Sequence, residues 1–381
     1  MPKLFKNIIV AVFIILSIFF LIIGTKDVIA SVQVAIMLWS TKIFPVLFPF
    51  YIFSSLAIKY GVAEFIGNLI YPVIKRVFNT SKISGFVFIM SLISGNPSSA
   101  IIISQLYEEG SLSKKEAQHL LSFCVFVNPL FCIGTIGYAY FQNASIGLIV
   151  LISHISANII IGILLRNNLK GNINISYNKV SKINKPNFGE TLTNILQSGI
   201  NTMFLIAGFM IFYNIVIVMV IYSNVLVYLY QSLSFIIHTM HLDWGVFQSF
   251  IIGIMEMVLG IEKVVNSTLP LRTSITVITM LISFGGFSIH SQIQSILIKV
   301  KLKYLPFLLS RLAQMIISGL IAYYLFPILY KEKAIDTSYI DYYPLNQKKM
   351  LLIIIFLLTI ILIITLLYNK KRKEGKIINE K

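Results

Sequence analysis

The chain of 381 residues is strongly apolar and basic, with 57% hydrophobic residues, 12% charged residues and a formal net charge of +17. Soluble domains have about 45–50% apolar and about 25% charged residues, so a water-soluble fold could not bury this much apolar surface. The basic residues lie in short clusters between apolar runs, which is typical of cytoplasmic loops and not of a nucleic-acid-binding surface. We therefore expect an all-α, polytopic transmembrane bundle whose partner is the lipid bilayer and not a nucleic acid.

The first predicted segment, residues 1–30, is an uncleaved transmembrane helix. Its apolar run from Asn7 to Gly24 is too long for a signal peptide and lacks a small-residue cleavage pattern. The region that follows, residues 31–166, begins with a long apolar run from Ser31 to Ile58, where prolines predict a kink. An amphipathic stretch from Gly61 to Phe78 suits the membrane interface.

A polar break divides the next apolar run, Ile83 to Leu106, at the sequence SGNPSSA. Gly95 ends one half-helix, and Pro97 can begin another at its first turn. Each half is too short to span the membrane, so we expect a re-entrant helical hairpin with its tip inside the bilayer. Two full spans are predicted next, His119 to Phe141 and Ser145 to Leu165.

A polar segment, residues 167–190, is predicted to be a cytoplasmic linker between two halves. Residues 191–330 then form the second half, residues 331–349 a polar loop, and residues 350–381 a last transmembrane helix with a basic tail. By the positive-inside rule, both termini and the linker are predicted to be cytoplasmic. The expected spans of the second half are Thr193 to Tyr222, Val225 to Met240, Gly245 to Leu259, Thr273 to Lys299 and Leu305 to Tyr330.

The second half contains a matching polar break, from Gly285 to Gln292, inside an apolar run of similar length. We therefore predict two repeated halves, each with a broken or re-entrant helical hairpin. Paired interrupted segments in two halves indicate a transporter-type site where the repeats meet.

These motifs resemble the sporulation integral membrane protein YlbJ family, whose members belong with the Gate, or nucleoside-recognition-type, membrane domains. The resemblance covers most of the chain and rests on five motifs: FPVLFPF from Phe44, the SGNPSSA break, the NPLF of Asn128 to Phe131, the GIME of Gly253 to Glu256, and GGFSIHSQ from Gly285. Where the family has Gly-Tyr-Pro and then Gly-Ala, this chain has Asn96 for the Tyr and two serines before the Ala. The resemblance implies a protein of the mother-cell or outer forespore membrane that is required for the spore cortex, and passage of a small solute.

Two ionisable residues lie inside apolar runs. A charged group at the bilayer centre costs at least about 2.5–3.5 kcal/mol, so Glu256 requires a compensating role. It is either a proton- or cation-coupled carboxylate in a cavity or a protonated, hydrogen-bonded structural residue. His290, in the second break, is predicted to face a pore or site, because an imidazole changes charge near neutral pH.

The other predicted pathway residues are polar side chains at the breaks. At the first break they lie beside free backbone groups, and half-helix N-termini there attract polar or anionic groups; the alternative is that they only satisfy that backbone. The predicted pathway residues are Asn96, Ser98, Ser99, Asn128, Glu256, Ser288, His290, Ser291 and Gln292, and the helix-breaking residues are Gly95, Pro97, Gly285 and Gly286.

No nucleophile triad, phosphate-binding loop, dinucleotide fingerprint or zinc motif occurs in the sequence, so we expect no enzyme activity, no metal and no cofactor. The leading hypothesis is a gate-type transporter or channel for an unidentified small solute. The alternative is a non-transporting scaffold that holds other spore-envelope membrane proteins, and a homo-oligomer is compatible with both.

Overall fold

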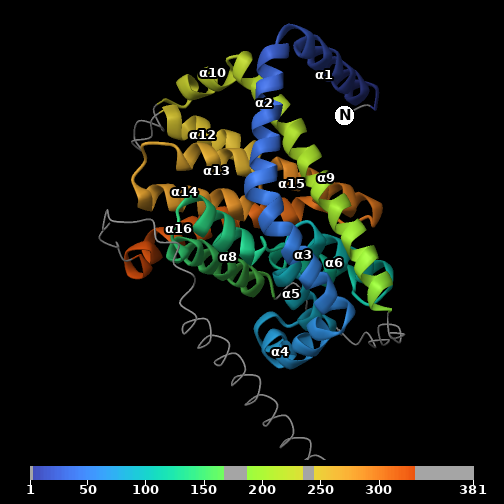
Figure 1. Cartoon of the computed structure of the whole chain (residues 1–381). Coiled ribbons are helices and arrows are strands. Elements are labelled where there is room, and N and C mark those ends of the chain that lie inside the picture. The colour runs from blue at the N-terminus through green and yellow to red at the C-terminus, as the bar shows by residue number, and fades with distance from the viewer. Residues whose placement is uncertain (1–2, 167–186, 235–243, 331–381) are drawn as a thin grey trace, which may run out of the picture. The chain divides into compact units, whose positions relative to one another are not determined.

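The computed structural model describes residues 3–166, 187–234 and 244–330 (Figure 1). Within these ranges the regular elements are helices, and no strand occurs. Five helices there are long and apolar enough to cross a membrane, or six if the bent pair Phe65–Phe78 and Ile83–Ser94 counts as one span. The all-α, polytopic class predicted from the sequence is therefore confirmed. The predicted loop 331–349, the predicted helix 350–381 and most of the predicted linker lie outside the described residues.

The first described part begins with two helices that are separated only by Gly24, so the second starts before the predicted boundary at residue 30. A π-helical segment, η1, precedes Pro45. Proline has no amide hydrogen, and its ring clashes with the carbonyl four residues earlier, so a regular α-helical turn is disfavoured there. The predicted kink is thus a local widening of one long helix. The elements are α1 (Lys3–Ile23), α2 (Thr25–Leu38), η1 (Trp39–Ile43), α3 (Phe44–Lys59), α4 (Val62–Phe78), α5 (Ile83–Ser94), α6 (Ser98–Glu108), α7 (Lys114–Phe123), the π-helical η2 (Phe131–Tyr140) and α8 (Ala144–Leu165).

The second described part begins with one long helix and then has a series of shorter ones. Asn187 starts that long helix as its N-cap, where its side chain accepts a hydrogen bond from the Gly189 amide at 3.1 Å. The elements are α9 (Phe188–Tyr222), α10 (Val225–Ser232), α12 (Trp244–Met255), α13 (Met257–Val265), α14 (Leu271–Phe284), α15 (Gly286–Lys299) and α16 (Tyr304–Leu329).

Helices that are neighbours along the chain pack against one another in both parts. Helix α5 packs against α6, and α12 packs against α13. Helix α8 packs against α7 and η2, while α16 packs against α14 and α15. Across the two parts, α7 contacts α16 and α14 contacts α8. In Figure 1 the long helices α2 and α9 lie side by side, as their contacts require.

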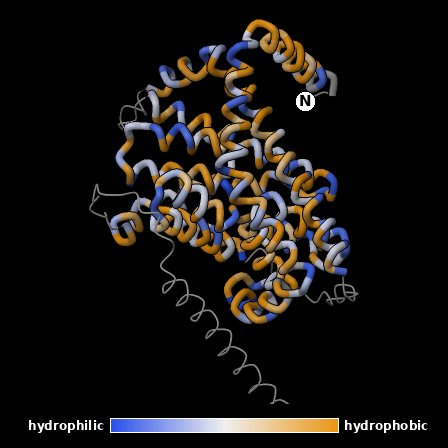
Figure 2. Tube along the Cα trace, viewed as in Figure 1, coloured by the Kyte–Doolittle hydropathy of each residue, from blue (hydrophilic) through white to orange (hydrophobic). Residues whose placement is uncertain are grey.

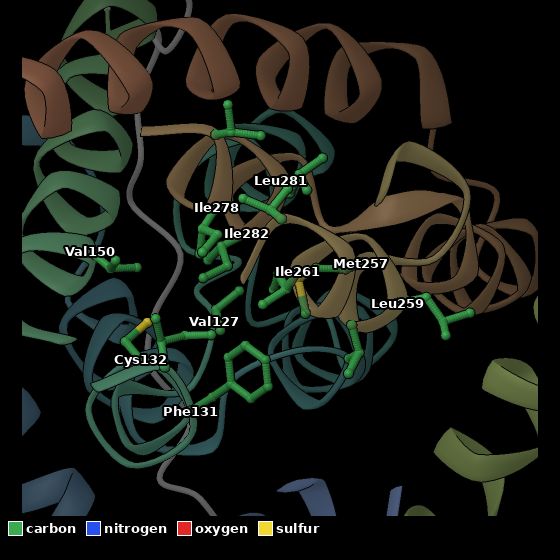
Figure 3. Packing of buried hydrophobic residues seen from close by; sticks show 14 of the residues in the cluster. Val127, Phe131, Cys132, Val150, Met257, Leu259, Ile261, Ile278, Leu281 and Ile282 are labelled. Atoms are coloured by element: carbon green, nitrogen blue, oxygen red, sulfur yellow. The ribbon is translucent and has the colours of Figure 1, made fainter. Parts of the chain in front are cut away.

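Apolar side chains occupy both the interior and the outer faces. Figure 3 shows part of the interior, where Phe131 of η2, Met257 of α13 and Leu281 of α14 point toward a common core. On the outside, Ile15 of α1 is 65% exposed and Phe204 of α9 is 63% exposed. Figure 2 shows that hydrophobic residues cover most of α1. A helix that is apolar on its outer face as well belongs in a bilayer.

Candidate functional site

The first helix break lies between α5 and α6 and is held by backbone contacts. Gly95 has φ +70°, and a Cβ there would lie 2.8 Å from the backbone nitrogen of Asn128, so only glycine fits. The hydroxyl of Ser99 donates to the Gly95 carbonyl at 2.9 Å. Because α5 and α6 pack against each other, the pair forms the hairpin that the sequence predicted.

The second break separates α7 from η2 and was predicted as a continuous span, His119 to Phe141. The structure corrects this expectation: α7 ends at Phe123, and η2 begins only at Phe131. Asn128 holds the intervening chain, because its Oδ1 accepts from the Leu130 amide at 2.8 Å and its Nδ2 donates to the Ile93 carbonyl at 3.2 Å. Pro129 supplies no amide hydrogen to continue the helix.

The third break lies at Glu256, inside the run Gly245 to Leu259 that was predicted as one span. Glu256 has an extended backbone, with φ −137° and ψ 114°, and its carboxylate accepts from the Leu259 amide at 2.7 Å. It is therefore the N-cap of α13. Helices α12 and α13 fold back on each other so closely that a Cβ on Gly260 would lie 2.1 Å from the Cα of Gly253.

The fourth break lies between α14 and α15, where Gly285 and Gly286 both have positive φ. Here α14 and α15 together form one candidate span, Leu271–Lys299. The structure therefore changes the predicted pairing: the hairpin of the second half is α12 with α13, while the Gly285 break interrupts a crossing helix. A Cβ on Gly286 would lie 2.9 Å from the backbone nitrogen of Met257, so this break touches the tip of that hairpin.

The four breaks meet at one cavity of about 80 Å³. The hydroxyl of Ser288 lies beside the carboxyl group of Glu256. Val127, Phe131 and Met257, which are labelled in Figure 3, also line the cavity. A few convergent polar groups within apolar walls are typical of a ligand site. The polar lining is Asn96, Asn128, Glu256, Ser288 and Gln292, and the apolar lining includes Ile43, Leu47, Phe131, Ile206, Phe209 and Met210.

The other predicted pathway residues do not line this cavity. His290 is 2% exposed and is held by two hydrogen bonds: its Nε2 donates to the Phe284 carbonyl at 3.0 Å, and its Nδ1 accepts from the Tyr304 hydroxyl at 2.7 Å. The hydroxyl of Ser291 bonds to that of Tyr213 at 2.5 Å. Ser98 and Ser99, like Gly95, Gly285 and Gly286, also lie outside the lining, whereas Pro97 is part of it.

A buried arginine that was not among the predicted residues supports the second break. Arg311 of α16 is 2% exposed, and its Nη1 donates to the Val125 carbonyl at 2.8 Å. Its Nη2 lies 3.4 Å from Oδ1 of Asn158, whose Nδ2 in turn donates to the carbonyl of His154 at 2.8 Å. The sequence signal was the arginine itself, because a cation within an apolar run requires partners. Among the described residues, no group of three or more His, Cys, Asp or Glu could hold a metal ion.

Comparison with known proteins gives one family match and one curated relative. Residues 40–147, which contain the first two breaks, match the family described as "Gate: Nucleoside recognition". This part of the chain is similar to the Gate family. It is also 27% identical over 319 residues to the "Sporulation integral membrane protein YlbJ" of Bacillus subtilis (strain 168), covering 78% of this chain and 77% of that protein. The resemblance drawn from the sequence motifs is thereby confirmed. No solved structure matches the chain.

Proposed function

We propose that this multi-pass membrane protein is a gate-type transporter or channel of the sporulation pathway, which passes a small polar solute and is required for the spore cortex. The observation that carries the proposal is the meeting of four helix breaks at one cavity lined by Asn96, Asn128, Glu256, Ser288 and Gln292. Broken helices at a repeat interface expose backbone groups that bind solutes in transporters. The proposal assigns no enzyme activity.

The element order supports an inverted repeat, because the two hairpins enter from opposite ends of the bundle. Hairpin α5–α6 starts beside the beginning of α7, where the Ser81 amide donates to Glu116 Oε1 at 2.7 Å. Hairpin α12–α13 leads into the beginning of α14, where Arg272 Nε donates to the Tyr323 carbonyl near the end of α16 at 2.9 Å. Since α16 starts at the α7 end of the bundle, the two hairpins open to opposite sides.

The charges indicate how the protein is oriented. Basic residues gather where α4 and α8 end and where α7 and α16 begin, and they include Lys75, Arg76, Lys114, Arg166 and Lys303. By the positive-inside rule this side is cytoplasmic. The first hairpin then enters from the cytoplasm and the second from outside. The proposal also assigns both basic termini to the cytoplasmic side by the same rule, and the protein to the mother-cell or outer forespore membrane.

The cavity indicates the kind of solute and the step that admits it. Its volume of about 80 Å³ is smaller than the roughly 300–1,000 Å³ of sites for drug-sized ligands. A nucleoside, which the family description suggests as the first solute to test, therefore enters only after the hairpin tips separate. The amides of Asn96, Asn128 and Gln292 suit a neutral, hydrogen-bonding solute.

The test compares two carboxylates of the same hairpin. Glu256→Gln removes an ionisable carboxyl group at the cavity, whereas Glu262→Gln makes the same change outside it. We expect Glu256→Gln to lower heat-resistant spore counts and cortex thickness at normal membrane levels, with Glu262→Gln close to the unmodified protein. In proteoliposomes, uptake of radiolabelled uridine and adenosine is measured for the same variants.

The outcomes distinguish transport from the scaffold alternative. Normal cortex in Glu256→Gln, with equal effects of both substitutions on uptake, would contradict the proposed pathway. A scaffold predicts that cavity substitutions are harmless and that loop substitutions abolish capture of other spore-envelope membrane proteins.

A further inference from the structure

A second, larger cavity lies between α7, α8 and α16, on the side of the bundle where basic residues gather. Its volume is about 690 Å³, and none of its lining residues lines the cavity at the helix breaks. Its mouth carries Lys114 and Lys115 from the start of α7 and Lys303 from the start of α16. Three ammonium groups and no carboxylate make this an anion-attracting surface.

A buried histidine within this cavity points to a ligand. His119 lines the cavity and is only 5% exposed; its ring lies near the backbone of Phe78, yet neither ring nitrogen makes a hydrogen bond of good geometry. Its ring instead lies against Phe123, with the ring centroids 4.9 Å apart. Buried polar nitrogens without partners are costly, so a group that bonds to the imidazole would stabilise the site.

The walls of the cavity show which kind of anion fits. Leu164 at the end of α8 is 66% exposed, and Leu305 and Leu309 on α16 are 61% and 57% exposed. All three line the cavity. A free phosphate ion would leave these apolar side chains uncovered, whereas an acyl chain would cover them. Basic pockets between transmembrane helices on the cytoplasmic side are typical sites for anionic lipid headgroups.

We propose that this cavity binds one anionic phospholipid of the cytoplasmic leaflet, with its phosphate between Lys114, Lys115, Lys303 and His119 and an acyl chain along Leu305 and Leu309. The amide of Gln118 fixes the geometry of the mouth, because its Nε2 donates to the Lys303 carbonyl at 3.0 Å. The lipid thus joins the start of α7 to the start of α16. Solute passage is not required for this binding.

The test uses the full-length purified protein. Phosphatidylglycerol is titrated in detergent, retained lipid is counted by native mass spectrometry, and thermal unfolding is followed in parallel. The test variant combines Lys114→Gln, Lys115→Gln and Lys303→Gln. The matched control removes the same number of exposed lysines elsewhere, by combining Lys82→Gln, Lys299→Gln and Lys301→Gln.

We expect one tightly retained phosphatidylglycerol, an affinity loss of about tenfold or more in the test variant, and little change in the control. His119→Leu, which keeps all the lysines, should also weaken retention. Equal retention of phosphatidylcholine would overturn the proposal, and so would equal losses in the test and control variants. Competition by inorganic phosphate without lipid retention would instead identify a free-phosphate site. If the test variant does not fold, native mass spectrometry of the unmodified protein decides instead. A spectrum without retained phosphatidylglycerol would then overturn the proposal.

Discussion

Substitution of Gly260 tests the hairpin that places Glu256 at the cavity. A Cβ at Gly260 would lie 2.1 Å from the Cα of Gly253, far below the 3.4 Å at which ordinary van der Waals contact begins. The Gly253 atom belongs to the backbone, so no side chain can move aside, and Gly260→Ala must separate α12 from α13. Overpacking of this kind costs about 1–3 kcal/mol, which exceeds the gain of about 1 kcal/mol in helix propensity.

Gly208 provides the matched control, because it is also helical and a Cβ there has no neighbour within 4 Å. Gly208→Ala should therefore gain stability from helix propensity alone, and because both variants share that gain they should differ by the overpacking cost of about 1–3 kcal/mol. Unfolding is followed with a thiol-reactive dye, since Cys124 and Cys132 are free and buried. Gly260→Ala should unfold at the lower temperature. A midpoint equal to or above that of Gly208→Ala would refute the close approach of the two helices.

Three further substitutions test contacts that hold the breaks and their surroundings, and each is measured by the same dye assay. Glu116→Leu removes the acceptor of two buried hydrogen bonds from the start of α5, at 2.7 and 2.8 Å, and should destabilise by about 2–3 kcal/mol; unchanged unfolding would contradict this. Asn128→Ala loses its bonds to Leu130 and Ile93 and should cost about 1–3 kcal/mol, while the exposed Asn266→Ala should be nearly neutral. Arg311→Lys keeps the charge but loses the fork of two donors, so it should also destabilise by about 1–3 kcal/mol, and full stability would argue against that geometry.

The sequence predicted the apolar spans and two of the breaks because glycine and proline leave a strong local signal. SGNPSSA and Gly285-Gly286 both contain such residues, and both break helices in the structure. Glu256 has no such signal, since glutamate is a good helix former and its neighbours are apolar. Its cap geometry depends on α13 folding back at Gly253 and Gly260, which is a tertiary contact.

The predicted role of His290 shows a second limit of the sequence. Residues four apart share a helix face, while residues two apart lie on nearly opposite faces. Ser288 and Gln292 line the cavity, and His290 between them therefore points away, toward Tyr304 and Phe284. Both faces of α15 carry polar residues in the sequence. Only the packing of α15 in the fold therefore determines which face lies at the cavity.

The polar side chains at the breaks therefore have two tasks that the sequence alone does not separate. Ser99 and His290 hold the backbone groups that each break frees, as any interruption inside a membrane requires. Gln292 lines the cavity without such a bond, whereas Glu256 does both, because it caps α13 and also faces the cavity. Glu256→Ala would remove both the cap of α13 and the polar group at the cavity, so its effect could not be assigned to either one. Glu256→Gln keeps a side-chain oxygen for the Leu259 amide and changes only the second oxygen, so it disturbs the cap of α13 less than alanine does and its effect reports mainly on the cavity.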